Sequence, residues 1–109
     1  MAKAINFTYD DTDYTLEFTR KTVEQMERAN FNIREVRNKP MTTLPTLFTG
    51  AFLAHHRWIK QDVIDKIYGK LTDKQDLMEK LIDMYTESVE TLFEEPVESE
   101  KNVKWEANF

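Results

Sequence analysis

Apolar and polar side chains alternate in two short runs at the start of the chain, separated by an Asp-rich segment at residues 10–13. An alternation with period 2 is typical of a β-strand, and two such runs around a polar linker indicate a hairpin. The pattern therefore predicts a β-hairpin over residues 4–18. Its apolar face would consist of Ile5, Phe7, Tyr9, Tyr14, Leu16 and Phe18. A lone two-stranded hairpin is marginal in water, so we expect this face to pack against other elements.

The stretch 41–59 changes to a helical period and contains Arg57 as its single formally charged residue. A helix with so few charged residues is typically buried on several sides. Thr42 or Thr43 can cap this helix, and Pro45 suits its first turn. The pattern predicts a central helix over residues 43–59. Its apolar stripe would comprise Leu44, Leu47, Phe48, Ala51, Phe52, His55, Trp58 and Ile59.

Three further helices are expected at about residues 20–30, 61–68 and 73–93. The first would begin at Thr19 or Thr22, and Gly69 would end the second in a left-handed turn. The last would begin at a capping box between Thr72 and Gln75. The sequence thus predicts a mostly helical α+β fold, with an N-terminal β-hairpin packed on a bundle of about four helices. We expect one globular domain over residues 1–95 and an acidic, flexible tail over residues 96–109.

Length and charge narrow the class of protein. A chain of 109 residues suits one domain with a core of its own, and the absence of cysteine fits a reducing compartment such as a cytosol. A net charge of −5 argues against nucleic-acid binding through phosphates. The N-terminus lacks the apolar run of a signal peptide, and the apolar part of residues 41–59 is too short and interrupted to span a membrane. Basic residues are in excess over residues 20–39 and acidic ones over residues 60–109, an asymmetry that can favour a homo-oligomer or simply solvated helix faces.

Residues with catalytic chemistry do not form a recognisable motif. His55 and His56 are adjacent and point about 100° apart on a helix, which does not match the spacing of a helical zinc site. Ser88 and Ser99 have no partner base in their sequence surroundings, and no glycine-rich phosphate loop is present. We therefore expect no metal, no cofactor and no enzymatic activity. His55 is interpreted as a core or interface histidine that hydrogen-bonds to a carbonyl or carboxylate.

Apolar surface is a better candidate for function than any catalytic group. The predicted helix 73–93 carries an apolar band wider than one neighbouring helix requires, which leaves part of it for a second internal element or for a partner. Trp105 lies in the polar tail, where burial in the domain is difficult, and exposed aromatics often anchor interfaces. The candidate partner-binding residues are Tyr85, Val89, Phe93 and Trp105.

Several segments together resemble one protein family. They are residues 16–27 (LEFTRKTVEQME), 39–42 (KPMT), 47–52 (LFTGAF), the pair His55–His56, residues 63–68 (VIDKIY) and the pair Met84–Tyr85. The resemblance is to small proteins from the tail gene modules of long-tailed phages of Gram-positive bacteria, the tail assembly chaperone class. It implies a non-catalytic protein of the host cytoplasm that binds the phage tape measure protein and helps to recruit subunits of the major tail tube protein.

Two alternatives stay open beside this reading. One is a structural component of the virion, such as a head–tail connector or a tail completion protein. The other is a small regulatory or host-interaction binding module. None of the three involves nucleic acid or a membrane as the partner.

Overall fold

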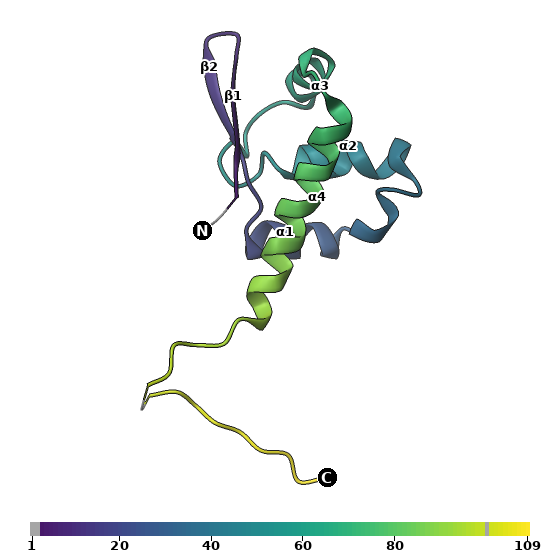
Figure 1. Cartoon of the computed structure of the whole chain (residues 1–109). Coiled ribbons are helices and arrows are strands. Elements are labelled where there is room, and N and C mark those ends of the chain that lie inside the picture. Colours follow the sequence, from purple (N-terminus) through teal and green to yellow (C-terminus); the bar gives the residue numbers. More distant parts are fainter. Residues whose placement is uncertain (1–2, 100) are drawn as a thin grey trace.

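The computed structural model describes residues 3–99 and 101–109, and it has a hairpin at the N-terminus followed by helices (Figure 1). Strands β1 (Ile5–Tyr9) and β2 (Thr12–Leu16) form the hairpin. The helices are α1 (Arg20–Arg28), α2 (Pro40–Gly50), α3 (Gln61–Lys70) and α4 (Lys74–Glu90), with single 3₁₀ turns at η1 (Ile33–Glu35) and η2 (Thr91–Phe93). This arrangement confirms the predicted α+β, mostly helical fold.

The hairpin turns within two residues, Asp10 and Asp11, so the linker is shorter than the predicted segment 10–13. Both have positive φ angles, 51° and 61°, which is the conformation that a tight type I′ hairpin turn requires. The strands are antiparallel, with Ile5 opposite Leu16 and Phe7 opposite Tyr14. This register places all the predicted apolar positions of the strands on one face, because directly opposite residues share a side of the sheet.

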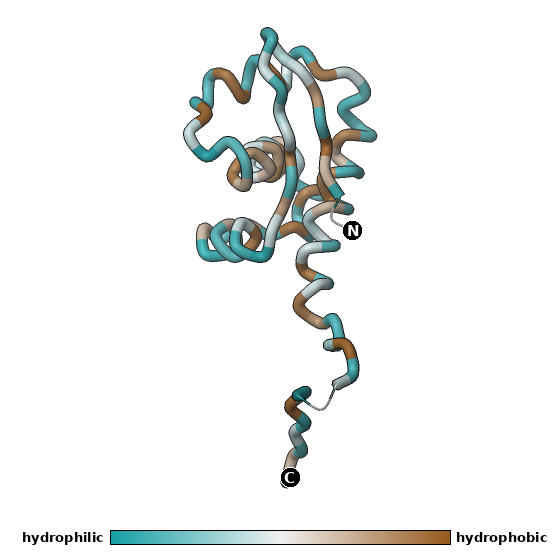
Figure 2. The backbone as a smooth tube through the Cα atoms, turned by 90° about the vertical axis from the view of Figure 1, so that its left-hand side faces the viewer, coloured by the Kyte–Doolittle hydropathy of each residue, from teal (hydrophilic) through white to brown (hydrophobic). Residues whose placement is uncertain are grey.

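The core lies between this face of the hairpin and the helices. Phe52 is fully buried at its centre, where its ring makes edge-on contacts with Phe7, Tyr14 and Phe48. Figure 2 shows that hydrophobic positions alternate with hydrophilic ones along the helices, as expected for elements that bury one side. The buried apolar residues are Leu16, Phe18, Val23, Met26, Val36, Leu47, Phe48, Ala51, Phe52, Ile64, Ile67, Leu81, Met84 and Tyr85.

The central helix differs from its prediction at both ends, because α2 begins at Pro40 and stops at Gly50. Residues 51–59 instead form turns, and the C=O of Ala51 accepts a hydrogen bond of 3.0 Å from the N–H of Glu17, just after β2. The predicted stripe is therefore divided: Phe52 stays in the core, whereas Trp58 is 88% exposed. The proline at the first helical position explains the early start, because an N–H group at that position would have no partner within the helix and its absence costs nothing.

Helix boundaries elsewhere show which capping signals were correct. Thr19 caps α1 and forms a reciprocal capping box with Thr22. Helix α3 continues through Gly69 to Lys70, so the predicted left-handed glycine stop is wrong. The predicted capping box at the start of α4 is also wrong. Asp73 occupies the cap position in a left-handed conformation, and its side chain makes no capping hydrogen bond.

Helix α4 connects the first part of the chain to the last. The ammonium of Lys3 lies 2.7 Å from a carboxylate oxygen of Asp83, and the hydroxyl of Ser88 donates a 2.8 Å hydrogen bond to the C=O of Phe18. After η2 the chain runs clear of the helices as an extended tail that contains no helix or strand in its described part (Figure 1). Over the described residues, the helices fall short of the length and apolar character that crossing a membrane requires.

Candidate partner-binding surfaces

The structure separates the four candidate residues. Tyr85 lies in the core with 1% of its surface exposed, and its ring centroid is 5.3 Å from that of Phe18 and 5.4 Å from that of Phe31. Burial, with a smaller effect from the charge of Glu27, raises the pKa of Tyr85 to about 12. This burial corrects the expectation that Tyr85 is a partner-binding residue, because the wide apolar band of α4 meets two internal neighbours at this point.

Val89 lines a shallow groove between α1 and α4, which we call the α1–α4 groove. It has a volume of about 280 Å³ and is lined by Arg20, Val23, Glu24, Glu27, Ser88, Val89 and Leu92. Arg20 closes one end, because its Nε donates a 2.9 Å hydrogen bond to the hydroxyl of Thr91. The groove thus has an apolar floor with acidic side chains on the α1 side.

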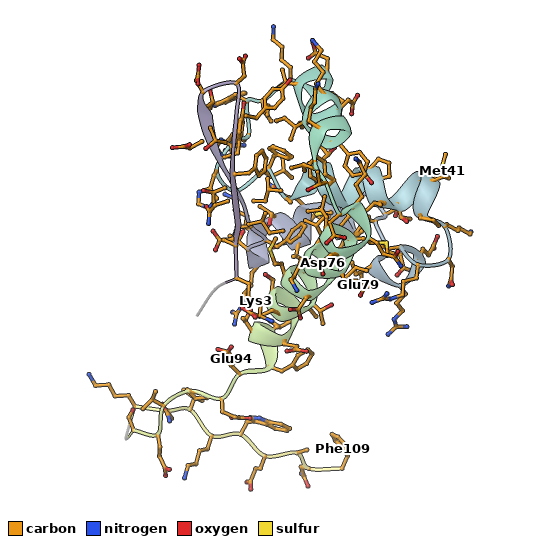
Figure 3. The ribbon with its side chains drawn as sticks, turned by 45° about the horizontal axis from the view of Figure 1, so that its top comes forward. Lys3, Met41, Asp76, Glu79, Glu94 and Phe109 are labelled. Carbon is orange, nitrogen blue, oxygen red and sulfur yellow. The ribbon has the colours of Figure 1, made fainter. Side chains whose placement is uncertain are left out.

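Phe93 and Trp105 are the two candidates that the structure leaves at the surface, 77% and 84% exposed. Phe93 follows α4 in the η2 turn, next to Leu92 at the end of the α1–α4 groove. Trp105 belongs to the extended tail together with the exposed side chains of Val97, Val103 and Phe109. Figure 3 shows the tail leaving the domain at Glu94 and ending at Phe109 away from the helices.

A second apolar groove, between α2 and α3, was not found from the sequence. This α2–α3 groove has a volume of about 330 Å³ and is lined by Pro40, Met41, Leu44, Pro45, Phe48, Asp65 and Tyr68. Met41 projects at the far edge of the domain, 88% exposed (Figure 3).

A signal for the α2–α3 groove was present in the sequence. Met41, Leu44, Pro45 and Phe48 follow the i, i+3, i+4, i+7 spacing of one helical face. This face is missed when the helix is started at Thr43, because Met41 then falls outside it. Recognition of Pro40 as the first helical residue would have included Met41 in the helix and revealed the face.

Charged groups are sparse around the α2–α3 groove. Asp65 is its one acidic lining residue, and the ammonium of Lys74 lies 5.3 Å from the ring centroid of Tyr68. An ammonium over an aromatic face is a favourable cation–π contact. The groove therefore offers a mainly apolar contact surface, with the carboxylate of Asp65 in its lining and the ammonium of Lys74 beside its lining residue Tyr68.

The two histidines have structural partners. The Nε2 of His55 lies 2.6 Å from the Oε1 of Glu17, as expected for an interface histidine bound to a carboxylate. The Nε2 of His56 accepts a 3.0 Å hydrogen bond from the backbone N–H of Thr15. Burial, together with the nearby charge of His55, lowers the pKa of His56. Within residues 3–99 and 101–109, no three His, Cys, Asp or Glu side chains are grouped so that they could hold a metal ion.

Comparison with protein families gives a match that extends over the whole chain. The model of a domain of unknown function, DUF5055, matches residues 1–109. The chain belongs to the DUF5055 family. No curated protein and no solved structure matches this DUF5055 chain.

Proposed function

We propose that the chain is a tail assembly chaperone of a long-tailed phage, which acts in the host cytoplasm by binding the tape measure protein and helping to recruit tail tube subunits. The observation that carries this proposal is the α2–α3 groove, an apolar surface of about 330 Å³ bordered by the exposed Met41. The resemblance of segments such as residues 47–52 to tail-module proteins supports the same assignment. In this role the chain binds other proteins and catalyses no reaction.

The groove has the chemistry needed to hold an apolar helix. A helical partner presents anchors at i, i+3, i+4 and i+7, and an elongated apolar groove buries them in one row. Methionine suits such a surface because its flexible thioether adapts to different side chains. A tape measure protein, as the resemblance implies, has long helical segments that are prone to aggregation before the tube forms around them, so a small protein that covers them would keep them soluble.

Phe93 and the neighbouring α1–α4 groove provide a second contact area. Leu92 and Phe93 are 66% and 77% exposed at the end of α4. With two separate apolar areas, one small protein can contact two successive turns of a partner helix, or two segments of a long partner. Linking two weak contacts in this way raises the overall affinity without strengthening either one.

Co-expression with the tape measure protein encoded by the same phage tests the proposal. We expect the tape measure protein to remain soluble and to co-purify with the wild-type chain. Met41→Asp introduces a charge into the α2–α3 groove and should abolish co-purification. Val97→Asp is the matched control, because Val97 is equally exposed (89%) but lies outside both grooves, and it should co-purify like wild type. A tape measure protein that is equally insoluble with and without the chain contradicts the proposal.

Analysis of purified phage particles separates the chaperone from a virion component. An assembly chaperone is displaced when the tube forms, so mass spectrometry should not detect the chain in finished particles. Its detection at a stoichiometry of a ring would favour a head–tail connector or a tail completion protein. Normal tail formation after deletion of its gene would favour a regulatory or host-interaction module.

A further inference from the structure

The outer edge of β1 is open to another strand. In the hairpin register Phe7 pairs with Tyr14 and Tyr9 pairs with Thr12 around the two-residue turn, so the backbone groups of Asn6 and Thr8 point away from β2. Among the described residues, the N–H and C=O groups of Asn6 and Thr8 have no hydrogen-bond partner outside the hairpin. Exposed edge strands of this kind are ready templates for pairing with another chain.

The other edge of the hairpin is occupied. The outward N–H of Thr15 in β2 is bound to His56, and the next outward N–H, that of Glu17, is bound to the C=O of Ala51. The turns of residues 51–59 thus cover β2 by hydrogen bonds. Within the part of the chain that the structure describes, β1 is therefore the more open of the two edges of the sheet.

The end of the tail has the sequence pattern of a strand. Val103, Trp105, Ala107 and Phe109 alternate with Lys104, Glu106 and Asn108. The period of 2 is that of an element with one apolar face and one polar face. The segment contains no proline or glycine, and at seven residues it is long enough to cover the five residues of β1. In the structure the large apolar side chains of the segment, those of Val103, Trp105 and Phe109, are exposed.

We propose that residues 103–109 of one copy of the chain bind to β1 of a second copy as a third, antiparallel strand. The pairing places Lys104 opposite Thr8 and Glu106 opposite Asn6, where the outward backbone groups of β1 lie. Trp105 then lies opposite Phe7 and Val103 opposite Tyr9. The apolar side chains of the added strand therefore extend the apolar face of the hairpin, and its polar side chains extend the polar face.

Charge complementarity sets the direction of the added strand. Asp10, Asp11 and Asp13 make the turn end of the hairpin acidic, and the hydroxyl of Thr8 donates a 2.6 Å hydrogen bond to Asp13. In the antiparallel direction Lys104 lies beside Thr8, close to this acidic end. In the parallel direction Glu106 would lie there instead, and carboxylates would face one another.

The antiparallel direction also favours a second copy over the tail of the same chain. Val103 must reach Tyr9 at the turn end, whereas Lys3 at the opposite end of the hairpin is held by Asp83 and Glu87 on α4. From Glu87 along α4 to Glu94 is about 10 Å, and from Lys3 along the strand to Tyr9 is about 20 Å. The nine chain steps from Glu94 to Val103 span about 30 Å only when fully extended, which leaves no slack.

An interface of this type joins two different surfaces, a tail and a strand edge. Each copy still has its own free β1 and its own tail, so the association continues from copy to copy into a ring or an open chain. The inference is independent of the proposed function, because it requires only copies of this chain.

Disulfide trapping tests the pairing directly, since the wild-type chain has no cysteine. A Thr8→Cys chain is mixed with a Lys104→Cys chain and oxidised gently. Opposite residues of a hydrogen-bonded antiparallel pair have Cα atoms about 5.5 Å apart, within the range of a disulfide. We expect several-fold more mixed dimer than from Thr8→Cys with Val97→Cys, whose cysteine is in the tail but outside the segment. Equal yields from the two mixtures overturn the proposal.

The chain that carries both cysteines, Thr8→Cys and Lys104→Cys, separates the two possible occupants. Disulfide-linked oligomers are expected. A disulfide formed only within single chains would show that the tail binds its own β1 and would overturn the assignment to a second copy.

Sedimentation velocity at several concentrations provides a second measurement without cysteine. Thr8→Pro removes the outward N–H of β1 while keeping the hairpin ladder, since proline is tolerated on an edge strand. Thr8→Val removes the same hydroxyl but keeps that N–H. We expect the wild type and Thr8→Val to associate as concentration rises, and Thr8→Pro to remain monomeric. A wild-type chain that is monomeric throughout, or a Thr8→Pro chain that associates like wild type, overturns the proposal.

Discussion

The imidazole of His56 accepts a hydrogen bond of 3.0 Å at Nε2 from the backbone N–H of Thr15. His56 can accept at Nε2 only when it is neutral, with its proton on Nδ1. His56, in the turns after α2, thus binds the edge strand β2 only when its imidazole is neutral.

Acidification should weaken the fold through His56. Its pKa in the folded state lies below its ordinary value of 6.5, because burial and the neighbouring His55 disfavour the charged form. The unfolded chain therefore binds more protons than the folded chain in this range, and the free energy of unfolding falls as pH falls from above 6.5 towards the folded-state pKa. Urea unfolding between pH 8 and pH 5.5 measures this dependence.

The control for this experiment is His56→Gln, which keeps an acceptor and cannot titrate. We expect its free energy of unfolding to depend less on pH than that of the wild type over the same range. Equal pH dependence in the two proteins would show that His56 is not the group responsible.

The turn of the hairpin should accept a stabilising substitution. Asp11 has a φ of 61°, a conformation that glycine adopts at lower cost than other residues. Asp11→Gly is expected to raise the free energy of unfolding by about 0.5–1 kcal/mol, and Asp11→Ala to lower it. Thermal unfolding of the three proteins gives the order, and a less stable Asp11→Gly chain would contradict the observed turn.

Close contact between α1 and α2 depends on Gly50. A Cβ atom at this position would lie 2.5 Å from the Sδ of Met26, which is buried. Gly50→Ala improves helix propensity by about 1 kcal/mol, but overpacking a core costs about 1–3 kcal/mol. We expect a net loss of stability in the wild-type chain, measured by urea unfolding.

Shortening Met26 should reverse the sign of the same substitution. In a Met26→Ala chain, which is itself destabilised by its cavity, the clash is absent and Gly50→Ala should be stabilising. A substitution that destabilises both backgrounds equally would show that Met26 is not what requires the glycine.

The core position of Tyr85 predicts a clear contrast with Phe93. Tyr85→Ala removes a ring packed against Phe18 and Phe31 and should cost about 3–5 kcal/mol. Phe93→Ala removes a ring that is 77% exposed and should change stability by less than about 0.5 kcal/mol. Urea unfolding compares the two, and a similar loss in both would contradict the buried placement of Tyr85.

Local patterns predicted the elements whose partners are local. The hairpin was predictable because two period-2 runs share one apolar face, and its register, with Phe7 opposite Tyr14, follows from that face. The long C-terminal helix was predictable because its apolar stripe, which includes Leu81 and Met84, persists over several turns. In each case the residues that determine the element lie within or next to it.

Tertiary contacts determined what the sequence could not show. The apolar stripe continues past Gly50. Ala51 and His56, however, accept hydrogen bonds from backbone N–H groups in and just after β2, more than 30 residues earlier. A pattern of side chains carries no information about such a competing backbone contact. The sequence pattern makes Tyr85 a candidate partner-binding residue for the same reason, because its burial depends on Phe18 and Phe31 from distant segments.

The position of α4 has a consequence for the order of events during synthesis. Phe18 depends on Ser88 for its carbonyl hydrogen bond and on Tyr85 for an aromatic contact, so it lacks both partners until α4 has been made. At translation rates of about 5–20 residues per second, Phe18 waits for several seconds without these two contacts. The part of the core around Phe18 is therefore completed only after α4 has been synthesised, about 70 residues later in the chain.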